Sequence, residues 1–262
     1  MRYIDCKKYA DEIIEEVAAI PDKKKALLVL TAGDDPASDA YMRGKEADCK
    51  RCGIPFLMRK VENQLELVAT INAGNMLDDI GGIIVQLPLP EGFDADEAIN
   101  EIKPEKDVDG FLADSPFKPC TPEGILHILD KEVGDLEGKT VLLIGKGKLV
   151  GRPLIDMLLD KGCTLTIAHS KTASLDGELY SYHDVVITAV GKPKLVDMSY
   201  AYSSVVIDAG ISRDENGKLC GDCYNFDYSY LGVRATQVPG GVGLMTRAML
   251  MKHMGEVNRT GE

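Results

Sequence analysis

The 262-residue chain lacks tryptophan altogether, has few aromatic residues and contains no long apolar run. A membrane-spanning helix needs about 18 or more consecutive apolar residues, and no stretch of the sequence approaches that length. The opening segment MRYIDCKKYADEIIEE also lacks the apolar core of a secretory signal. The apolar fraction of 45% and the charged fraction of 27% are ordinary for globular proteins, so we expect a folded cytoplasmic protein with no membrane partner.

Positive charge is also scarce. The chain carries 30 lysines and arginines against 42 acidic residues, for a net charge of −12. Because nucleic-acid binding depends mainly on basic side chains that meet phosphates, we expect no nucleic-acid partner. Residues 1–119 have a net charge of −9 and residues 120–262 only −3. An anionic ligand is therefore expected to bind in the second half.

The seven cysteines do not form a recognisable metal site. Cys49 and Cys52 have C-x-x-C spacing, as do Cys220 and Cys223. A zinc ribbon or finger places its two ligand pairs roughly 12–20 residues apart, and these pairs are separated by far more. Cys49 and Cys52 also lie one turn apart in a helical segment. We expect no metal and interpret the cysteines as free thiols in a reducing compartment.

Short apolar runs alternate with helical segments along the whole chain. The runs predicted to be strands are residues 25–31, 54–58 and 82–86 in the first half and 140–144, 164–168, 184–190 and 205–209 in the second. Continuous apolar strands between helices indicate parallel sheets that are covered on both faces. The length and this pattern predict two α/β domains, with a boundary near the proline-rich segment Pro116–Pro122.

The segment TVLLIGKGKLVGRPLIDMLLDKG has the pattern of a dinucleotide site. A strand is followed by a turn with Gly145, Gly147 and Gly151, and then by an amphipathic helix. Glycines let the backbone approach a pyrophosphate, and the helix N-terminus offers unpaired N–H groups. The spacing is G-x-G-x-x-x-G rather than the usual G-x-G-x-x-G, so a tight strand–helix turn that binds nothing stays open as an alternative.

The next strand favours NADP over NAD. In an NAD site this strand usually ends in a carboxylate that binds the ribose 2′-hydroxyl. Here it ends in the sequence Ala168–Thr172, AHSKT, which has no carboxylate. Lys146, Lys148 and Lys171 lie nearby in the sequence and are candidates to face a 2′-phosphate. The alternative for each lysine is a place on the solvated rim.

Several polar residues in the first half are candidates for catalysis. Tyr41 and Lys45 have i, i+4 spacing, which places them on one face of a helix. Gln86 follows an apolar strand, at the position where α/β proteins bind ligands. Asp107 and Asp109 are paired carboxylates in a turn. Each feature alone is compatible with an ordinary surface or structural role.

Eight motifs occur together in a single order. They are GDDPAS-x-x-Y-x-x-x-K (Gly33–Lys45), VQLPLP (Val85–Pro90), KDVDGF (Lys106–Phe111), PCTPEGI (Pro119–Ile125), VGRP (Val150–Pro153), HSKT (His169–Thr172), AVGKP (Ala189–Pro193) and PGGVG (Pro239–Gly243). With this series the chain resembles the bifunctional methylenetetrahydrofolate dehydrogenase/methenyltetrahydrofolate cyclohydrolase (FolD) family over nearly its whole length.

The resemblance implies two consecutive reactions of one-carbon metabolism. The substrate 5,10-methylenetetrahydrofolate is oxidised by NADP⁺ to the 5,10-methenyl cation, which water then converts to 10-formyltetrahydrofolate, a compound used in purine biosynthesis. By the same resemblance, Lys45 is the main catalytic residue, Tyr41 stacks near the folate ring, Gln86 orients Lys45 and Asp109 holds the pterin. Because a lysine transfers protons only when partly neutral, we also predict that partial burial and the cationic substrate depress the pKa of Lys45 in the complex below its usual value of about 10.4.

The resemblance also implies the architecture and the remaining site residues. We expect an N-terminal three-layer αβα catalytic domain (1–119 with 245–262) and a C-terminal Rossmann-like NADP-binding domain (120–244) that flank a cleft, in a homodimer. The expected substrate contacts beyond the catalytic residues are Leu87, Pro239, Gly240 and Gly241. The expected cofactor contacts are Gly145, Lys146, Gly147, Val150, Gly151, His169, Ser170 and Ile211.

The sequence departs from the family pattern in three places. Lys146-Gly147 replaces the family's Arg/Ala-Ser, so the serine hydroxyl that binds the cofactor is missing. Leu244 replaces a proline, and the loop Leu112–Lys118 is short. Three alternatives therefore stay open: an enzyme that keeps only one of the two activities, another two-domain NADP oxidoreductase of the shikimate dehydrogenase type, and a catalytically silent nucleotide- or folate-binding regulator.

Overall fold

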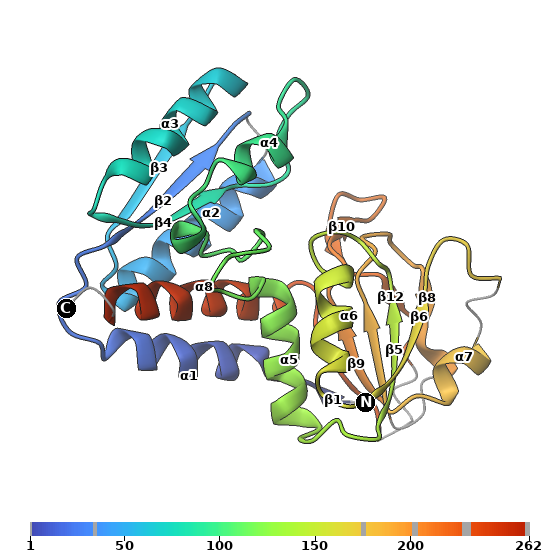
Figure 1. Cartoon of the computed structure of the whole chain (residues 1–262). Coiled ribbons are helices and arrows are strands. Elements are labelled where there is room, and N and C mark those ends of the chain that lie inside the picture. The colour runs from blue at the N-terminus through green and yellow to red at the C-terminus, as the bar shows by residue number, and fades with distance from the viewer. Residues whose placement is uncertain (1, 34–35, 174–176, 201–203, 227–231, 260–262) are drawn as a thin grey trace. The chain divides into compact units, whose positions relative to one another are not determined.

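A computed structural model describes residues 2–33, 36–173, 177–200, 204–226 and 232–259 (Figure 1). The chain forms two compact units. The first unit is Asp11–Cys120 with Arg247–Glu262, and the second is Met1–Ala10 with Thr121–Thr246. The sequence analysis assigns residues 1–10 to the catalytic domain instead. They join the second unit because β1 (Arg2–Tyr3) pairs with β13 (Arg234–Ala235).

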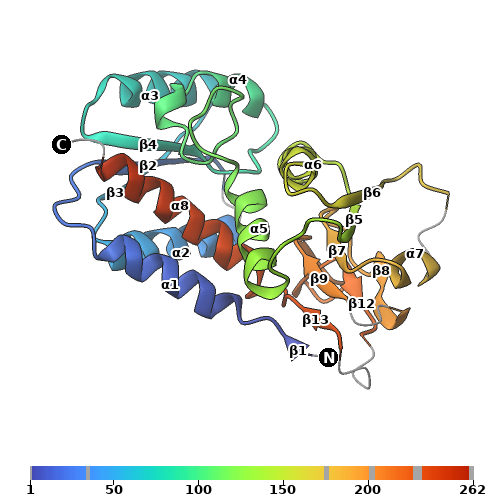
Figure 2. The ribbon, with the colours of Figure 1, turned by 60° about the horizontal axis from the view of Figure 1, so that its bottom comes forward.

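The first unit contains a parallel sheet in the order β3-β2-β4, in which β2 (Ala26–Thr31) lies between β3 (Phe56–Lys60) and β4 (Ile80–Val85). Figures 1 and 2 show α3 (Gln64–Met76) and α4 (Ala95–Asn100) on one face of the sheet and α2 and α8 on the other. The bounds of the remaining helices are α1 (Cys6–Ala18), α2 (Pro36–Cys52) and α8 (Val242–Arg259). Apolar residues of β2, β4, α3 and α4 form a buried core on the first face.

Local hydrogen bonds explain where α3 begins and ends. Asn63 caps α3, since its side chain accepts a hydrogen bond of 3.0 Å from the Glu66 N–H. At the other end, the Lys106 ammonium donates to the carbonyls of Gly74, Asn75 and Leu77, and so adds a cationic partner at the C-terminus of the helix. Lys106, the first residue of KDVDGF and the last of the short helix η1 (Pro104–Lys106), is therefore a structural residue.

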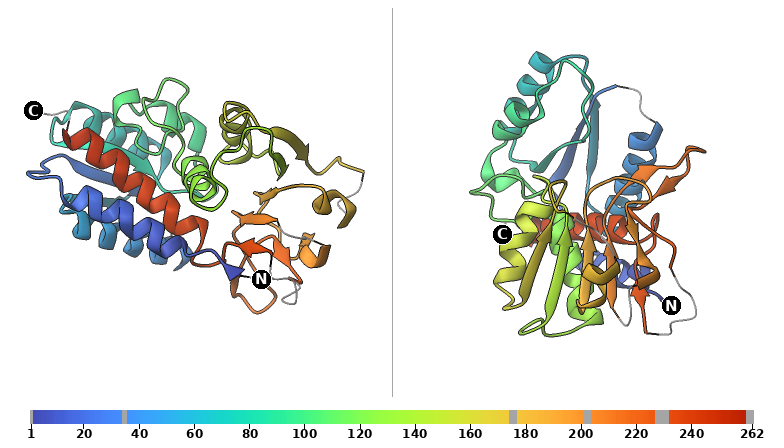
Figure 3. Two further views of the ribbon diagram at one scale, coloured as in Figure 1. Left: turned by 90° about the horizontal axis from the view of Figure 1, so that it is seen from below. Right: turned by 90° about the vertical axis from the view of Figure 1, so that its right-hand side faces the viewer.

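The second unit has a six-stranded parallel sheet in the order β1-β13-β9-β7-β5-β6. Its main strands are β5 (Thr140–Ile144), β6 (Thr164–Ala168), β7 (Val185–Thr188) and β9 (Val205–Asp208). Figure 3 shows α6 (Gly151–Leu159) on one face and α7 (Gly177–Ser181) on the other. The remaining elements are α5 (Cys120–Glu132), β8 (Val196–Asp197), η2 (Met198–Tyr200), β10 (Ser212–Arg213), β11 (Leu219–Cys220) and β12 (Cys223–Tyr224).

The strand order creates a switch point at β5. The chain runs from β5 to β6 on one side and then returns to place β7 on the other side of β5. In open α/β sheets, ligands bind at such a point, beyond the carboxyl ends of the strands. The residue that follows β5 is Gly145, the first glycine of the predicted dinucleotide turn.

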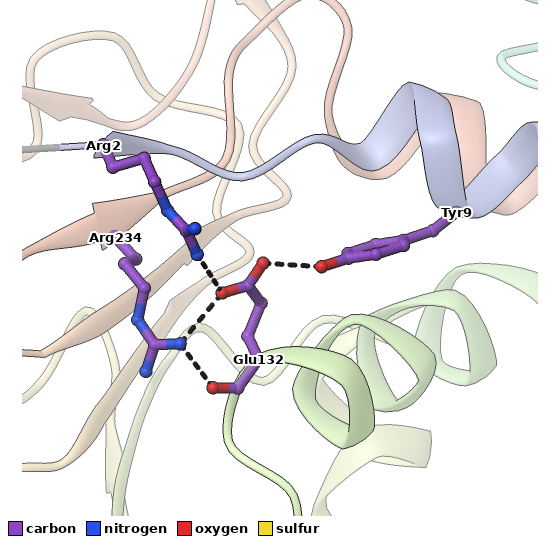
Figure 4. Close-up of polar contacts among 4 residues, drawn as sticks. All are labelled: Arg2, Tyr9, Glu132 and Arg234. Atoms are coloured by element: carbon purple, nitrogen blue, oxygen red, sulfur yellow. Dashed lines mark hydrogen bonds and ion pairs between the residues drawn. The ribbon is translucent and has the colours of Figure 1, made fainter.

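A buried carboxylate joins the N-terminal segment to the rest of the second unit. Glu132, at the end of α5, accepts hydrogen bonds from Tyr9 (2.7 Å), Arg2 (2.9 Å) and Arg234 (2.9 Å) (Figure 4). Its side chain is only 4% exposed. Desolvation, and then the bond to this carboxylate, raise the pKa of Tyr9 to about 12. The cluster therefore ties β1, α1, α5 and β13 together.

Candidate functional site

Lys45 is a buried amine with one well-defined partner. It lies on α2 and is only 5% exposed, and its Nζ donates to Gln86 Oε1 over 2.9 Å. The ring of Tyr41, one helical turn earlier, lies beneath it, with 5.3 Å between Nζ and the ring centroid. The fold thus brings together three predicted catalytic residues that are up to 45 positions apart in the sequence.

The surroundings favour the neutral form of Lys45. Burial lowers the pKa of Lys45, and the nearby charge of Asp109 opposes this shift without reversing it, while Arg247 adds to it. No carboxylate of the described residues lies within ion-pair distance of its amine. Burial also raises the pKa of Tyr41, and Asp109 raises it further, so the phenol keeps its proton. Burial therefore acts in the direction predicted from the sequence, and the further effect of a bound substrate stays a prediction.

Gln86 is held so that its oxygen faces the lysine. It directly follows β4, and its Nε2 donates to the Leu87 carbonyl over 2.8 Å. That bond leaves Oε1 to accept from Lys45. Leu87 itself is half-buried and packs against the core of the first unit.

The two carboxylates of KDVDGF have different environments. Asp107 is only 1% exposed, and it accepts hydrogen bonds from the N–H groups of Gly110 (3.1 Å) and Leu112 (2.7 Å), so it shapes the loop. Asp109 is half-exposed, and its carboxylate accepts no hydrogen bond from any described residue. Asp109 is therefore the one that is available for a ligand, and its charge reaches both Lys45 and Tyr41.

The glycine turn of the second unit is shaped by close backbone contacts. Gly145 has φ +109°, and a Cβ at this position would lie 2.4 Å from the Ala189 carbonyl oxygen. A Cβ on Gly151 would lie 2.3 Å from the Gly145 carbonyl oxygen. Only glycine fits at these two positions. A Cβ on Gly147, by contrast, would have open space around it, since no described atom beyond its chain neighbours would lie within 4 Å.

The N-terminus of α6 directly follows the glycine turn. The helix begins at Gly151, and its N-cap residue Val150 makes no side-chain capping bond. The Arg152 N–H donates to the Gly147 carbonyl over 2.9 Å, and Pro153 has no N–H, so the positive end of the helix dipole is the main feature here that favours an anion. Lys146 and Lys148 are exposed in the adjoining turn and add positive charge near it.

The remaining predicted cofactor residues lie after the strands of the same sheet. His169, after β6, is half-buried, with its N–H bonded to Thr172 Oγ1 and its Nδ1 accepting from the Lys171 N–H. Ser170 is exposed. Ile211, after β9, is 58% exposed.

Three predicted substrate residues fall in the second unit, whereas Lys45 belongs to the first. Pro239 and Gly240 are exposed, Gly241 is buried, and all three precede α8. Asp34 and Asp35 of the GDDPAS motif lie outside the described residues.

The sequence analysis did not single out three buried or half-buried charged residues, Asp208, Asp222 and Arg247. Asp208 ends strand β9, so the argument applied to Gln86 could have found it. Asp222 carries no comparable signal. Arg247 comes from α8 and pairs with Asp48 of α2 over 2.9 Å.

Other kinds of site are not seen in the described part of the chain. No group of three or more His, Cys, Asp or Glu side chains there is placed to hold a metal ion. None of the helices described is long and apolar enough to cross a membrane. All seven cysteines are free thiols.

Two family models match the chain. The model described as tetrahydrofolate dehydrogenase/cyclohydrolase, catalytic domain, matches residues 4–109. The model described as tetrahydrofolate dehydrogenase/cyclohydrolase, NAD(P)-binding domain, matches residues 119–260. Together they span both units.

Individual proteins are similar over almost the full length. The bifunctional protein FolD of Lachnoclostridium phytofermentans is 39% identical, with 95% of each chain covered. The crystal structure of the bifunctional enzyme FolD from Campylobacter jejuni has a TM-score of 0.90 and 35% identity, covering 99% of both chains. A Trypanosoma brucei methylenetetrahydrofolate dehydrogenase-cyclohydrolase, complexed with NADP cofactor and inhibitor, has a TM-score of 0.89 and 28% identity, covering 98% of this chain and 97% of that one.

Proposed function

Because the chain belongs to the tetrahydrofolate dehydrogenase/cyclohydrolase family, we propose that it oxidises 5,10-methylenetetrahydrofolate with NADP⁺ and hydrolyses the resulting 5,10-methenyltetrahydrofolate to 10-formyltetrahydrofolate. The family, the two-domain α/β fold and this pair of activities are those predicted from the sequence motifs, and the comparisons confirm them. The observation that carries the proposal is the buried Lys45 amine, held at 2.9 Å by Gln86.

Lys45 is suited to the hydrolytic step. Addition of water to the methenyl cation requires proton transfers at the attacking water and at the departing ring nitrogen. The desolvation that lowers the pKa of Lys45 shifts the amine toward its neutral form, which can accept a proton. Gln86 fixes the direction of the amine, Tyr41 offers a ring face for the folate, and Asp109 offers a carboxylate for the pterin. The bound cationic substrate would lower the pKa of Lys45 further.

The second unit fits a nicotinamide dinucleotide, which supplies the hydride acceptor when bound. The Gly145 turn and the N-terminus of α6 would hold the pyrophosphate. NADP is favoured over NAD because no carboxylate follows β6 and Lys146 is exposed beside the turn. Hydride transfer needs the two rings to be held face to face and no protein base at the reacting carbon, so the role of this unit is positioning.

One assay tests both activities. The protein is incubated with 5,10-methylenetetrahydrofolate and NADP⁺, and NADPH, methenyl and formyl products are followed together. We expect NADPH and 10-formyltetrahydrofolate to accumulate. The absence of NADPH would contradict the dehydrogenase activity, and a methenyl product that is not hydrolysed would contradict the cyclohydrolase activity. An unhydrolysed methenyl product would favour an enzyme that keeps only the dehydrogenase activity. Because no methenyl compound forms without the first step, hydrolysis is also measured with methenyltetrahydrofolate supplied directly.

We further propose that the protein is a cytoplasmic homodimer whose formyl product enters purine biosynthesis. The seven free thiols, five of them buried, support a reducing compartment. Light scattering should give a mass of about twice the 28.5 kDa of the chain. A mass of one chain at micromolar concentration would contradict the dimer.

A further inference from the structure

Two carboxylates are buried in the second unit without a cationic partner. Asp208 is 4% exposed and Asp222 is fully buried, and no lysine or arginine of the described residues pairs with either. A buried charge is costly unless hydrogen bonds compensate for the lost solvation. Both carboxylates accept several backbone hydrogen bonds instead, so the segments that donate these bonds are held tightly.

Asp222 holds the loop that follows β7. Its Oδ2 accepts from the Val190 N–H over 2.8 Å, and its Oδ1 accepts from the Lys192 N–H over 2.7 Å. Its backbone carbonyl also accepts from the N–H groups of Leu195 (2.8 Å) and Val196 (3.0 Å). A single residue therefore fixes both ends of the loop 190–196.

Asp208 connects Asp222 to the ends of the strands. Its carboxylate accepts from Thr188 Oγ1 (3.1 Å) at the end of β7, from the Gly210 N–H (3.0 Å) and from the N–H groups of Asp222 (3.1 Å) and Cys223 (2.9 Å). The segment 222–223 is thus anchored on β7 and β9, and it in turn carries the Asp222 carboxylate.

The loop held by Asp222 borders the dinucleotide turn. The carbonyl of Ala189, the residue just before the loop, lies against Gly145, 2.4 Å from where a Cβ would be. On its other side, the Asp222 carboxylate lies against Gly210, whose Cβ would be 2.1 Å from Oδ1. Asp222 therefore sits between the loop after β7 and the segment after β9 that leads to Ile211, at the carboxyl edge of the sheet.

We propose that Asp222 is a positioning residue for the dinucleotide: it holds the N–H groups of Val190 and Lys192 and thereby sets the loop that borders the Gly145 turn. This inference rests on the proposed function of the second unit. The position requires a carboxylate, since both oxygens accept an N–H. An asparagine has one acceptor oxygen, and its NH₂ group would face a second donor.

The experiment compares Asp222→Asn with the wild type and with Asp214→Asn. Asp214 accepts the N–H groups of Asn216 and Lys218 on a single oxygen, which an asparagine retains. Three quantities are measured: the KM for NADP⁺, the dissociation constant of NADP⁺ by calorimetry, and the cyclohydrolase rate on methenyltetrahydrofolate without cofactor. For Asp222→Asn we expect the first two to rise about tenfold, within the range for leaving a buried donor unpaired, and the third to stay within about twofold. Asp214→Asn should change none of them.

Gly210→Ala gives a second, independent route. The added methyl group would overlap the Asp222 carboxylate and displace it while the aspartate itself is kept. We expect the same pattern, weaker NADP⁺ binding with cyclohydrolase activity retained. The proposal is overturned if NADP⁺ binding by Asp222→Asn stays within twofold of wild type, or if both variants lose the two activities in parallel. A wild-type protein that forms no NADPH would instead contradict the proposed function, and calorimetry with NADP⁺ would still test the role of Asp222.

Discussion

Replacing Lys45 by methionine tests the chemistry of the first unit. Methionine has a similar length and no amine, so it fills the buried position and removes only the proton-transfer group. Positioned acid–base groups typically contribute 10²–10⁴-fold to a rate. We therefore expect the cyclohydrolase kcat of Lys45→Met to fall at least about 100-fold. NADP⁺ binding, which depends on the second unit, should be unchanged.

The same substitution should stabilise the fold near neutral pH. Burial places the pKa of Lys45 in the folded state below its unfolded value of 10.5. Between the two pKa values the unfolded chain binds more protons, so the contribution of Lys45 to the free energy of unfolding rises with pH. At pH values below the folded-state pKa of Lys45, the buried ammonium lowers the free energy of unfolding by about 1.4 kcal/mol for each unit by which burial lowers that pKa. The increase in the free energy of unfolding caused by Lys45→Met should therefore be largest at pH values below the folded-state pKa, and it should vanish above about pH 10.5.

The assay follows cyclohydrolase rates and urea unfolding midpoints of wild type and variant at several pH values. The wild-type rate should rise with pH and level off with an apparent pKa below 10.4, as a neutral amine becomes populated. Lys50→Met, at an exposed lysine of the same helix, serves as the control and should change neither quantity. Full cyclohydrolase activity in Lys45→Met would refute the assigned role, and a wild-type rate that still rises at pH 10 would refute the depressed pKa.

Three further predictions concern single contacts. Gln86→Leu removes the acceptor of the Lys45 amine, 2.9 Å away, and should lower the cyclohydrolase kcat about 10–100-fold with NADP⁺ binding intact, as checked by steady-state kinetics and calorimetry. Gly147→Ser restores a hydroxyl where no described atom obstructs it and should tighten NADP⁺ binding about 3–10-fold; calorimetry that shows no gain would argue against a cofactor contact at this position. Glu132→Gln removes a buried charge that is bonded to two arginines and Tyr9. It should lower the free energy of unfolding by about 1–3 kcal/mol in urea titrations. This range is below the value for a fully buried ion pair, because Arg2 is largely exposed and solvent weakens its attraction to Glu132. The exposed Glu137→Gln is its control, and equal stability of the two variants would count against the cluster.

Much of the secondary structure follows from local pattern. The run TVLLI coincides with β5, because a buried parallel strand is a continuous apolar segment. The run TLTIA coincides with β6, a largely exposed edge strand whose alternating threonines favour extended structure. The helix predicted from Pro36 ends at Cys52, directly before Gly53 with φ +67°. The short strands β1 and β13 were not predicted, since two residues carry no periodicity.

The candidate site was also predictable from the sequence only in part. Residue type and spacing were sufficient to select Tyr41 and Lys45 as a pair on one helix face, Gln86 as a strand-end residue and the glycine turn as a candidate dinucleotide site. They could not distinguish Asp107 from Asp109, because the difference lies in which of the two meets the N–H groups of Gly110 and Leu112.

The sequence by itself determined the family, the alternation of the longer strands and helices and the candidate residues for the two reactions, because motifs of a few neighbouring residues indicate each of these. The tertiary structure decided which distant residues meet. It brings the buried amine of Lys45 within hydrogen-bond distance of Gln86. It places residues 1–10 in the second unit through the pairing of β1 with β13. It also brings the Asp222 carboxylate to the N–H group of Val190, 32 positions earlier in the chain. Periodicity shows which side chains face a core, whereas strand order and long-range hydrogen bonds determine which of them become partners there.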